Sequence, residues 1–239
     1  YLKTAGQRKG KSLLSTNARS LYYSKLTAAL NAAVKAGHIQ ANPVNLLDRT
    51  EKPHQIQTER DYLTENELQA LINTPCTHTD KDAGPAFLFS CFCGLRWSDI
   101  SVLTWGDVRT DAGTYWIEKR MVKTQELITL PLSADAVFFM PERGNKKPTD
   151  PVFNLGTYDA ANRAVKKWVK DAGIDKAITF HCARHTFATL MLTNNVDIYT
   201  TSKLLGHKSI KVTQIYAAVV DKKKREAVNA ISGKFNLSK

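Results

Sequence analysis

The stretch HCARHTFATLML, residues 181–192, places an arginine between two histidines, inside a segment whose apolar pattern predicts a helix over residues 180–194. His181 and His185 are four residues apart, so they would share one face of that helix, as the two histidines of many zinc sites do. Cys182 occupies the position that the glutamate holds in the metalloprotease pattern HExxH, and no third ligand is evident. A zinc site is therefore the weaker interpretation, and we expect no metal here.

The stretch GLRWSDISVLTW, residues 94–105, contains a second arginine at the start of an apolar segment. Arg96 stands three residues before Asp99, a spacing at which opposite charges on a helix attract each other by about 0.2–0.5 kcal/mol. Taken alone, this pattern predicts a simple ion pair.

The stretch LLGHKSIKVTQIYAAV, residues 204–219, places a Gly-His pair nine residues before Tyr216. The apolar spacing predicts a helix over residues 210–219. Tyr216 would share a face of that helix with Val212 and Val219, so periodicity alone favours a packed core tyrosine over a reactive one.

The whole chain has 239 residues and is basic, with 34 Lys+Arg against 22 Asp+Glu and a formal net charge of +12. Such a balance favours a polyanionic partner, of which nucleic acid is the commonest. The longest apolar runs are too short to cross a bilayer. The sequence also contains no long basic amphipathic segment with exposed Trp or Phe, which would indicate binding to a membrane surface. We therefore expect a nucleic-acid partner and no membrane.

The cysteines and the start of the chain indicate the compartment. Cys76, Cys91, Cys93 and Cys182 form no CxxC pair, which predicts free thiols in a reducing compartment and hence a cytoplasmic protein. The first residues, YLKTAGQRKGK, lack the apolar segment of a signal peptide and also lack a Met. We expect the chain to be a fragment of a longer protein.

The first part of the chain predicts a small helical domain over residues 1–50. A lysine-rich helix is expected there, capped by Thr16 or Asn17 and stopped by Gly37. Residues 51–61 are polar, contain a proline and show no periodicity, so they are predicted to be a linker.

The remaining residues, 62–239, predict a second domain that is mainly α with a small antiparallel β-sheet. Thr64 and Glu67 form a capping box at its first helix. Two alternating segments, TYWIEKRM and ELITLPL, predict a β-hairpin, and Lys123 in its connection is, taken alone, a solvated lysine. Further helices are predicted in the segments GPAFLFSCFC, RWSDISVLT and SADAVFFM, and over residues 157–172, 180–194, 197–205, 210–219 and 221–231.

Together, the three quoted stretches are similar in order and spacing to the three signature blocks of the tyrosine recombinase (phage integrase) family. The resemblance runs from about Leu63 to Ile231, and residues 1–50 look like part of the family's helical core-binding domain. It implies the tyrosine recombinase catalytic fold, preceded by a partial DNA-binding domain. One departure is that Cys182 and Ala183 stand where a leucine next to the arginine is frequent in the family.

The resemblance implies that strands are exchanged through a covalent 3′-phosphotyrosine intermediate, with six catalytic residues: Arg96, Lys123, His181, Arg184, His207 and Tyr216. The residue chemistry agrees with these roles. Two guanidinium groups suit the non-bridging oxygens of a phosphodiester, which they bind bidentately without losing charge. The Tyr216 phenol, with an ordinary pKa near ~10, needs a partner for its proton, for which His181 is the best candidate. His207 would bind a phosphate oxygen.

Further roles follow from the resemblance. Lys123 matches the lysine that protonates the leaving 5′ oxygen in the family, with Lys119 as the alternative. Asp99 would fix Arg96 through an ion pair, and His185 would form a hydrogen bond within the helical core. The helix at 221–231 would dock onto a neighbouring protomer, or else pack on its own domain.

The function implied is a site-specific DNA recombinase or integrase of a mobile element or prophage. It would act as a homotetramer on two double-stranded DNA recombination sites, be a monomer in isolation, and work near the nucleoid with accessory DNA-bending proteins. Neither a cofactor nor a metal ion is expected. The alternatives are a type IB topoisomerase-like nicking and resealing enzyme, a chromosome-dimer resolvase or invertase of the same family, and a non-catalytic DNA-binding protein on the same scaffold.

Overall fold

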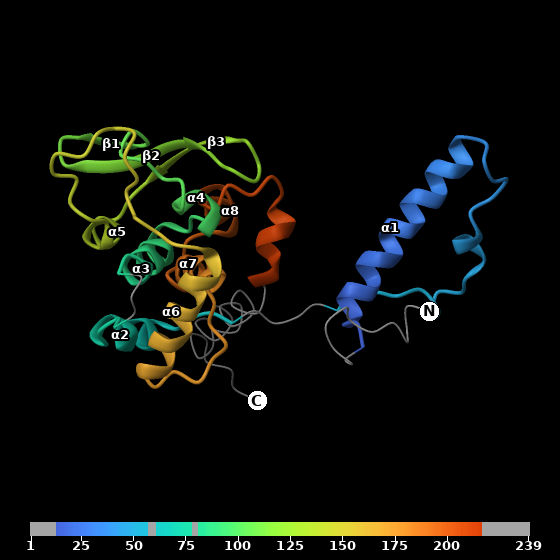
Figure 1. Ribbon diagram of the computed structural model, residues 1–239, viewed down its shortest axis with the longest axis horizontal. Coiled ribbons are helices and arrows are strands. Elements are labelled where there is room, and N and C mark those ends of the chain that lie inside the picture. Colours follow the sequence, from blue (N-terminus) through green and yellow to red (C-terminus); the bar gives the residue numbers. More distant parts are fainter. Residues whose placement is uncertain (1–12, 57–60, 78–80, 217–239) are drawn as a thin grey trace, which may run out of the picture. The chain divides into compact units, whose positions relative to one another are not determined.

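The computed structural model describes residues 13–56, 61–77 and 81–216. Contacts divide the chain into a first unit that ends at residue 59 and a second unit that starts at residue 60 (Figure 1). The division lies within the segment 51–61, for which the sequence predicts a linker. The roles of the two units as domains remain predictions.

The first unit consists of helix α1 (Thr16–Lys35) and the short 3₁₀ helix η1 (Pro43–Leu46). Ser15 caps α1 by accepting a hydrogen bond from a backbone N–H of the first turn. The predicted caps, which lie one and two residues later, are therefore wrong. Gly37 adopts a φ of 76° just after α1 and stops the helix, as expected for a residue without a Cβ.

The second unit contains a three-stranded antiparallel sheet in the order β1-β2-β3. Its strands are β1 (Val108–Asp111), β2 (Thr114–Arg120) and β3 (Leu127–Pro131). The hairpin of β2 and β3 is confirmed, whereas β1 was not predicted, because its four residues carry no apolar alternation. Ile117 and Leu130 are paired across the hairpin, and both are buried.

The rest of the second unit is helical, which confirms the predicted fold class. Its helices are α2 (Glu65–Asn73), α3 (Ala83–Cys93), α4 (Trp97–Ile100), α5 (Ala134–Phe139), α6 (Tyr158–Asp171), α7 (Phe180–Thr193), α8 (Ile198–Leu204) and the 3₁₀ helix η2 (Ile210–Tyr216). The capping box of Thr64 and Glu67 forms as predicted, and Ser133 caps α5. Within the part of the chain described, no helix is both long and apolar enough to cross a membrane.

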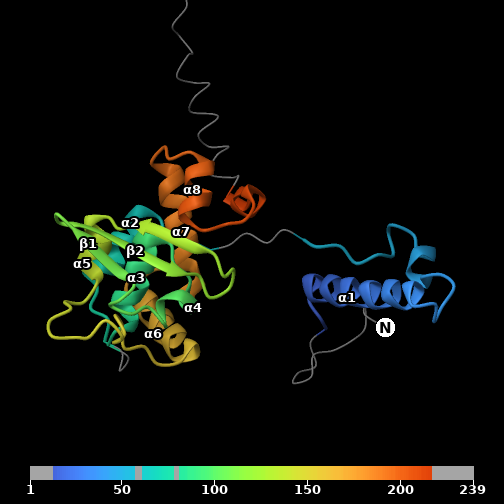
Figure 2. The ribbon, with the colours of Figure 1, turned by 90° about the horizontal axis from the view of Figure 1, so that it is seen from above.

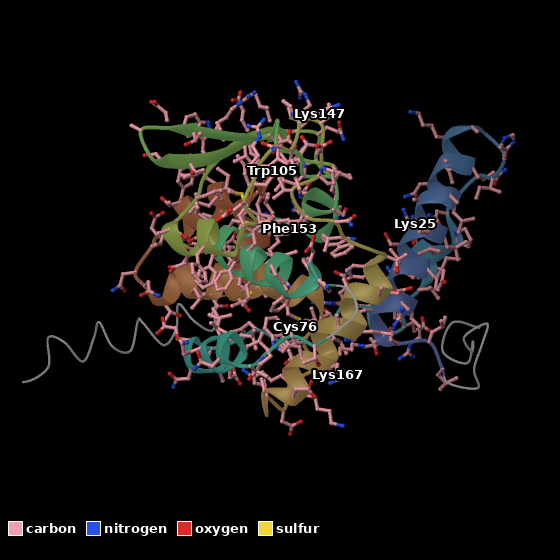
Figure 3. All side chains as sticks on the ribbon, turned by 60° about the vertical axis from the view of Figure 1, so that its left-hand side comes forward. Lys25, Cys76, Trp105, Lys147, Phe153 and Lys167 are labelled. Carbon is pink, nitrogen blue, oxygen red and sulfur yellow. The ribbon has the colours of Figure 1, made fainter. Side chains whose placement is uncertain are left out.

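The core of the second unit is built around α3, which is apolar on all sides and packs against α5, α6 and α7. The sheet covers one side of this helical layer (Figures 1 and 2). Trp105 and Phe153 lie in the interior, whereas Lys147 and Lys167 lie at the outer surface (Figure 3). Because α3 is enclosed, the segment that follows it is held in a fixed position.

The last described segments differ in part from the prediction. Helices α7 and α8 match the segments predicted at 180–194 and 197–205. Over residues 210–216, however, the chain forms the 3₁₀ helix η2 and not the expected α-helix. The β-branched residues of this segment weaken its preference for an α-helix, and the 3₁₀ helix is the tighter alternative. The residues after Tyr216, including the helix predicted at 221–231, lie outside the described part of the chain.

Candidate active site

Arg184, on α7, is held in place by two backbone carbonyl groups. Only 4% of the residue is exposed. Its Nη1 donates to the carbonyl oxygen of Gly94 at 2.7 Å, and its Nη2 donates to that of Leu205 at 2.5 Å. These carbonyls lie at the C-terminal ends of α3 and α8, where unpaired carbonyl groups favour a cation. The guanidinium group is thereby fixed where three helices meet.

Gly94 is required by this arrangement for two reasons. Its φ of 74° lies in the left-handed region, which ends α3 and turns the carbonyl oxygen towards Arg184. A Cβ at this position would also lie 2.5 Å from Cδ1 of Phe187. In the sequence Gly94-Leu95-Arg96, the glycine therefore ends α3, and the arginine, two residues later, directly precedes the next helix.

Arg96 carries a buried hydrogen-bond donor that none of the described residues satisfies. The residue flanks the N-terminus of α4, and its buried Nη1 has no hydrogen-bond partner among residues 13–56, 61–77 and 81–216. Burial lowers the pKa of Arg96, while the charge of Asp99 and, once its phenol is ionised, that of Tyr216 oppose this effect. Because an unpaired, buried, charged donor is unfavourable, this position suits an anionic ligand.

Asp99 does not form the expected ion pair with Arg96: no ion pair joins these two residues in the described part of the chain. The physical reason is that Arg96 is extended, with a ψ of 156°, so the spacing rule for helices does not apply to it. The fully buried Asp99 instead accepts a hydrogen bond from the backbone N–H of Val122 at 2.7 Å. This bond ties the turn between β2 and β3 to α4.

The two candidate lysines lie in different surroundings. Lys119, on β2, is buried, and its Nζ donates to the backbone oxygen of Asp99 at 2.9 Å. Burial lowers the pKa of Lys119, and the nearby carboxylate of Asp107, 3.8 Å away, opposes that shift. Lys123 is exposed in the turn between β2 and β3, next to the residue that Asp99 binds.

His207 follows α8 and lies near both arginines. Its Nδ1 is 2.8 Å from the hydroxyl of Thr213, a fully buried residue of η2. Burial, together with the positive charges of Arg184 and Arg96, lowers the pKa of His207 to about 4. The imidazole is therefore neutral at pH 7, and it can donate a hydrogen bond from only one nitrogen.

Tyr216, at the end of η2, is buried among apolar side chains, with its hydroxyl against a histidine. It belongs to a cluster with Phe187 and Leu205, and only 7% of it is exposed. Its hydroxyl lies 2.5 Å from Nδ1 of His185. The tyrosine is thus both a packed aromatic, as periodicity indicated, and the partner of a titratable group.

His181 lies one turn before His185 on α7 and is exposed. The two imidazole rings meet edge to face, with centroids 4.6 Å apart. Both line a pocket of about 460 Å³, whose lining residues are Asp61, Ala177, Thr179, His181, Cys182 and His185. In the described residues, no group of three or more His, Cys, Asp or Glu side chains is arranged to hold a metal ion.

The site is strongly cationic. Burial, followed by the charge of Arg96, lowers the pKa of Arg184 to about 9, while the negative charge of an ionised Tyr216 and that of Asp99 oppose the shift. Both guanidinium groups remain charged at pH 7, so two like charges lie near each other with low solvent access. Such a pair is best compensated by an oxyanion that both can bind.

The structure brings most of the predicted residues together. Arg96 and Arg184 interact electrostatically with each other and with both His207 and Tyr216. His181 contacts His185, whose Nδ1 in turn lies against the Tyr216 hydroxyl. Sequence reasoning missed the contact of His185 with Tyr216, and it missed Thr213. The signal for the first was the spacing of the two histidines, since His185 shares its helix face with His181.

Comparison with known proteins identifies the fold and the motifs. Residues 61–223 match the phage integrase family. The tyrosine recombinase of Thermosipho africanus is 28% identical over 218 residues, which cover 89% of this chain and 75% of that protein. Tyrosine recombinase XerC of Caldanaerobacter subterraneus is 33% identical over 207 residues, covering 82% of this chain and 57% of that protein.

Solved structures show the same fold. A lambda integrase dimer bound to a COC′ core site is similar with a TM-score of 0.64 and 21% identity, over 84% of this chain and 73% of that one. XerH site-specific recombinase bound to palindromic difH substrate gives a TM-score of 0.65 and 19% identity, over 91% of this chain and 68% of that one.

Proposed function

Since the chain belongs to the phage integrase family and is a tyrosine-type site-specific recombinase, we propose that Tyr216 is the nucleophile that cleaves and rejoins its DNA strands. The observation that carries this assignment is the unsatisfied Nη1 of Arg96, buried close to Arg184 and to the Tyr216 phenol. A nucleophile beside two unneutralised guanidinium groups is the arrangement that attack on a phosphodiester requires.

The scissile phosphate is bound by Arg96, Arg184 and His207. Arg184 uses two N–H groups on the protein, which fixes its plane and leaves its other N–H groups for a phosphate oxygen. Arg96 supplies the free Nη1, and His207 donates from its second ring nitrogen. The negative charge that grows on these oxygens in the transition state then meets fixed donors.

The proton of Tyr216 passes to Nδ1 of His185, the ring nitrogen that lies against the hydroxyl. His185 is in contact with the hydroxyl, and His181, in edge-to-face contact with His185, is exposed to solvent. The phenolate oxygen then forms a bond to phosphorus while the bond from phosphorus to the 5′ oxygen breaks. The products are a 3′-phosphotyrosine and a 5′-hydroxyl.

Lys123 protonates the leaving 5′ oxygen. It is exposed on a turn that Asp99 anchors beside Arg96 through Val122, whereas the amine of Lys119 already donates to a backbone carbonyl. An exposed lysine on an anchored turn can reach a bound DNA strand, while a buried lysine cannot do so without losing its partner.

Strand rejoining reverses these steps, and the covalent bond conserves the energy of the phosphodiester, so the reaction needs neither ATP nor another cofactor. The enzyme acts on double-stranded DNA recombination sites as a homotetramer, assisted by accessory DNA-bending proteins, in the cytoplasm near the nucleoid. Residues 1–50 form part of its DNA-binding domain. The DNA that it recombines belongs to a mobile element or prophage.

A suicide DNA duplex, nicked just beyond the cleavage site, tests the proposal. The chain should form an SDS-resistant adduct with this DNA in the presence of EDTA, and Tyr216→Phe should bind the duplex equally well without forming one. An adduct in the variant would remove Tyr216 from its role. Two paired sites should give exchanged strands, whereas relaxation of single supercoiled circles without exchange would favour the topoisomerase-like alternative.

A further inference from the structure

We propose that Thr213 is a positioning residue that fixes the tautomer of His207, so that the free ring nitrogen of the histidine always carries the proton. The inference rests on the proposed function, in which His207 donates a hydrogen bond to the scissile phosphate. It concerns a side chain that has no contact with DNA in that reaction and acts only through the imidazole.

The contact itself is short and enclosed. The Thr213 hydroxyl lies 2.8 Å from Nδ1 of His207, and Thr213 is fully buried. Within the described residues this is the one hydrogen bond of the Thr213 side chain. The backbone of His207 is fixed separately, because its N–H donates to the carbonyl oxygen of Ser202 at 3.0 Å.

Hydrogen-bond accounting decides which atom donates. If Nδ1 carried the proton, the buried hydroxyl would accept from it, and the hydroxyl hydrogen would have no acceptor of its own. If Nε2 carries the proton, the hydroxyl donates to Nδ1 and every buried hydrogen is used. The second arrangement is the more stable one, so Nε2–H is the expected tautomer.

The charges around the ring make this choice matter. Arg184 and Arg96 disfavour the doubly protonated imidazolium, so the histidine cannot supply a donor simply by gaining a proton. A neutral ring donates to phosphate through Nε2 only in the Nε2–H tautomer. In the other tautomer a nitrogen lone pair would face the phosphate oxygen and repel it.

The matched variants are Thr213→Val, which removes the hydroxyl and keeps the shape, and Thr213→Ser, which restores it. Thr189→Val is the control, because the Thr189 hydroxyl is likewise buried but has no hydrogen-bond partner in the part of the chain that the structure describes. All three variants are compared with the parent chain for their unfolding midpoints and their affinity for duplex DNA, which shows whether each one still folds.

The first readout is ¹⁵N NMR of the full chain labelled in histidine, with His207→Gln used to assign the signals. The parent chain and Thr213→Ser should show the Nε2–H pattern, and Thr213→Val should shift towards a mixture of tautomers. An unchanged pattern in Thr213→Val would overturn the proposal, as would an Nδ1–H pattern in the parent chain. This measurement does not depend on whether the chain cleaves DNA.

The second readout is the rate of single-turnover adduct formation on suicide DNA. Thr213→Val should be slower by about tenfold with unchanged DNA affinity, and Thr213→Ser and Thr189→Val should keep the parent rate. In a His207→Gln background, Thr213→Val should have no further effect. Equal slowing in both backgrounds would show a merely structural role. A parent chain that forms no adduct would contradict the proposed function instead.

Discussion

The hydroxyl of Tyr216 lies 2.5 Å from Nδ1 of His185, one turn of α7 beyond His181. A histidine expected to support the helical core is therefore the group in contact with the proposed nucleophile. His181, for which the sequence predicted that role, lies with its ring edge to face against the His185 ring. Because the Tyr216 hydroxyl lies against His185, substitutions of the two histidines should affect cleavage to different extents.

The first prediction concerns this histidine pair. His185→Gln should slow adduct formation on suicide DNA by about 10²-fold, since a glutamine cannot take up the phenol proton. His181→Gln should slow it by about tenfold or less, because a solvent molecule can replace the exposed imidazole. The measurement is the single-turnover rate at saturating enzyme. A larger loss for His181→Gln than for His185→Gln would return the direct role to His181.

The second prediction separates the two lysines. Lys123→Ala should slow cleavage of ordinary DNA by about 10²–10⁴-fold and regain most of the rate on DNA with a 5′-bridging sulfur, because a thiolate leaves without a proton. Lys119→Met, which removes the bond to the Asp99 backbone, should not be rescued by sulfur. Rescue of Lys119→Met, with none for Lys123→Ala, would reverse the assignment.

The third prediction concerns the turn that positions Arg184. Gly94→Ala should lower the free energy of unfolding by about 2–4 kcal/mol, since it combines a left-handed backbone with a Cβ that meets the Phe187 ring. Urea denaturation measures the loss. Gly37→Ala is the control, because Gly37 has a similar φ of 76° and open space around it. This variant should lose only the free energy that the left-handed backbone costs an alanine. Equal losses would show that the ring contact is unimportant.

The fourth prediction is a pH dependence of stability. The pKa of His207 is about 4 in the folded chain, against an ordinary value of about 6.5 in the unfolded chain. Between these values the unfolded chain binds more protons, so stability should fall as the pH falls from about 6.5 to about 4. The slope is at most about 1.4 kcal/mol per pH unit, and smaller because the ring is only half-buried.

His207→Gln provides the comparison for this pH effect. Urea denaturation of both chains at pH 7, 5.5 and 4.5 should show a shallower loss for the variant, because it lacks the titrating ring beside Arg184 and Arg96. Identical pH dependence in the two chains would contradict the lowered pKa. Other titrating groups contribute equally to both curves and cancel in the difference.

Much of this site could be predicted from sequence because its residues lie in short motifs with fixed local structure. Gly94 ends a helix and Arg96 follows it, and Arg184 sits within a strongly apolar helix, so their neighbourhood is fixed by adjacent residues. The helices at 180–194 and 197–205 were predictable for the same reason. Strand β1 was not, since its pairing with β2 is made by backbone bonds that its sequence does not signal.

The contacts that differ from expectation are those between segments distant in the chain. Asp99 accepts a hydrogen bond from the backbone of Val122, 23 residues later in the chain, and no local spacing rule describes that contact. His185 meets Tyr216 only because η2 folds back onto α7. Side-chain partners of this kind depend on tertiary packing, which helical periodicity does not encode.

The carbonyl groups that hold Arg184 lie 90 residues before it and 21 residues after it. A nascent or partly unfolded chain therefore carries the basic residues that attract DNA before it has an arginine aimed at a phosphate. Because the arginine depends on carbonyl groups at the ends of two other helices, we expect DNA cleavage only from a chain in which α3, α7 and α8 are all folded.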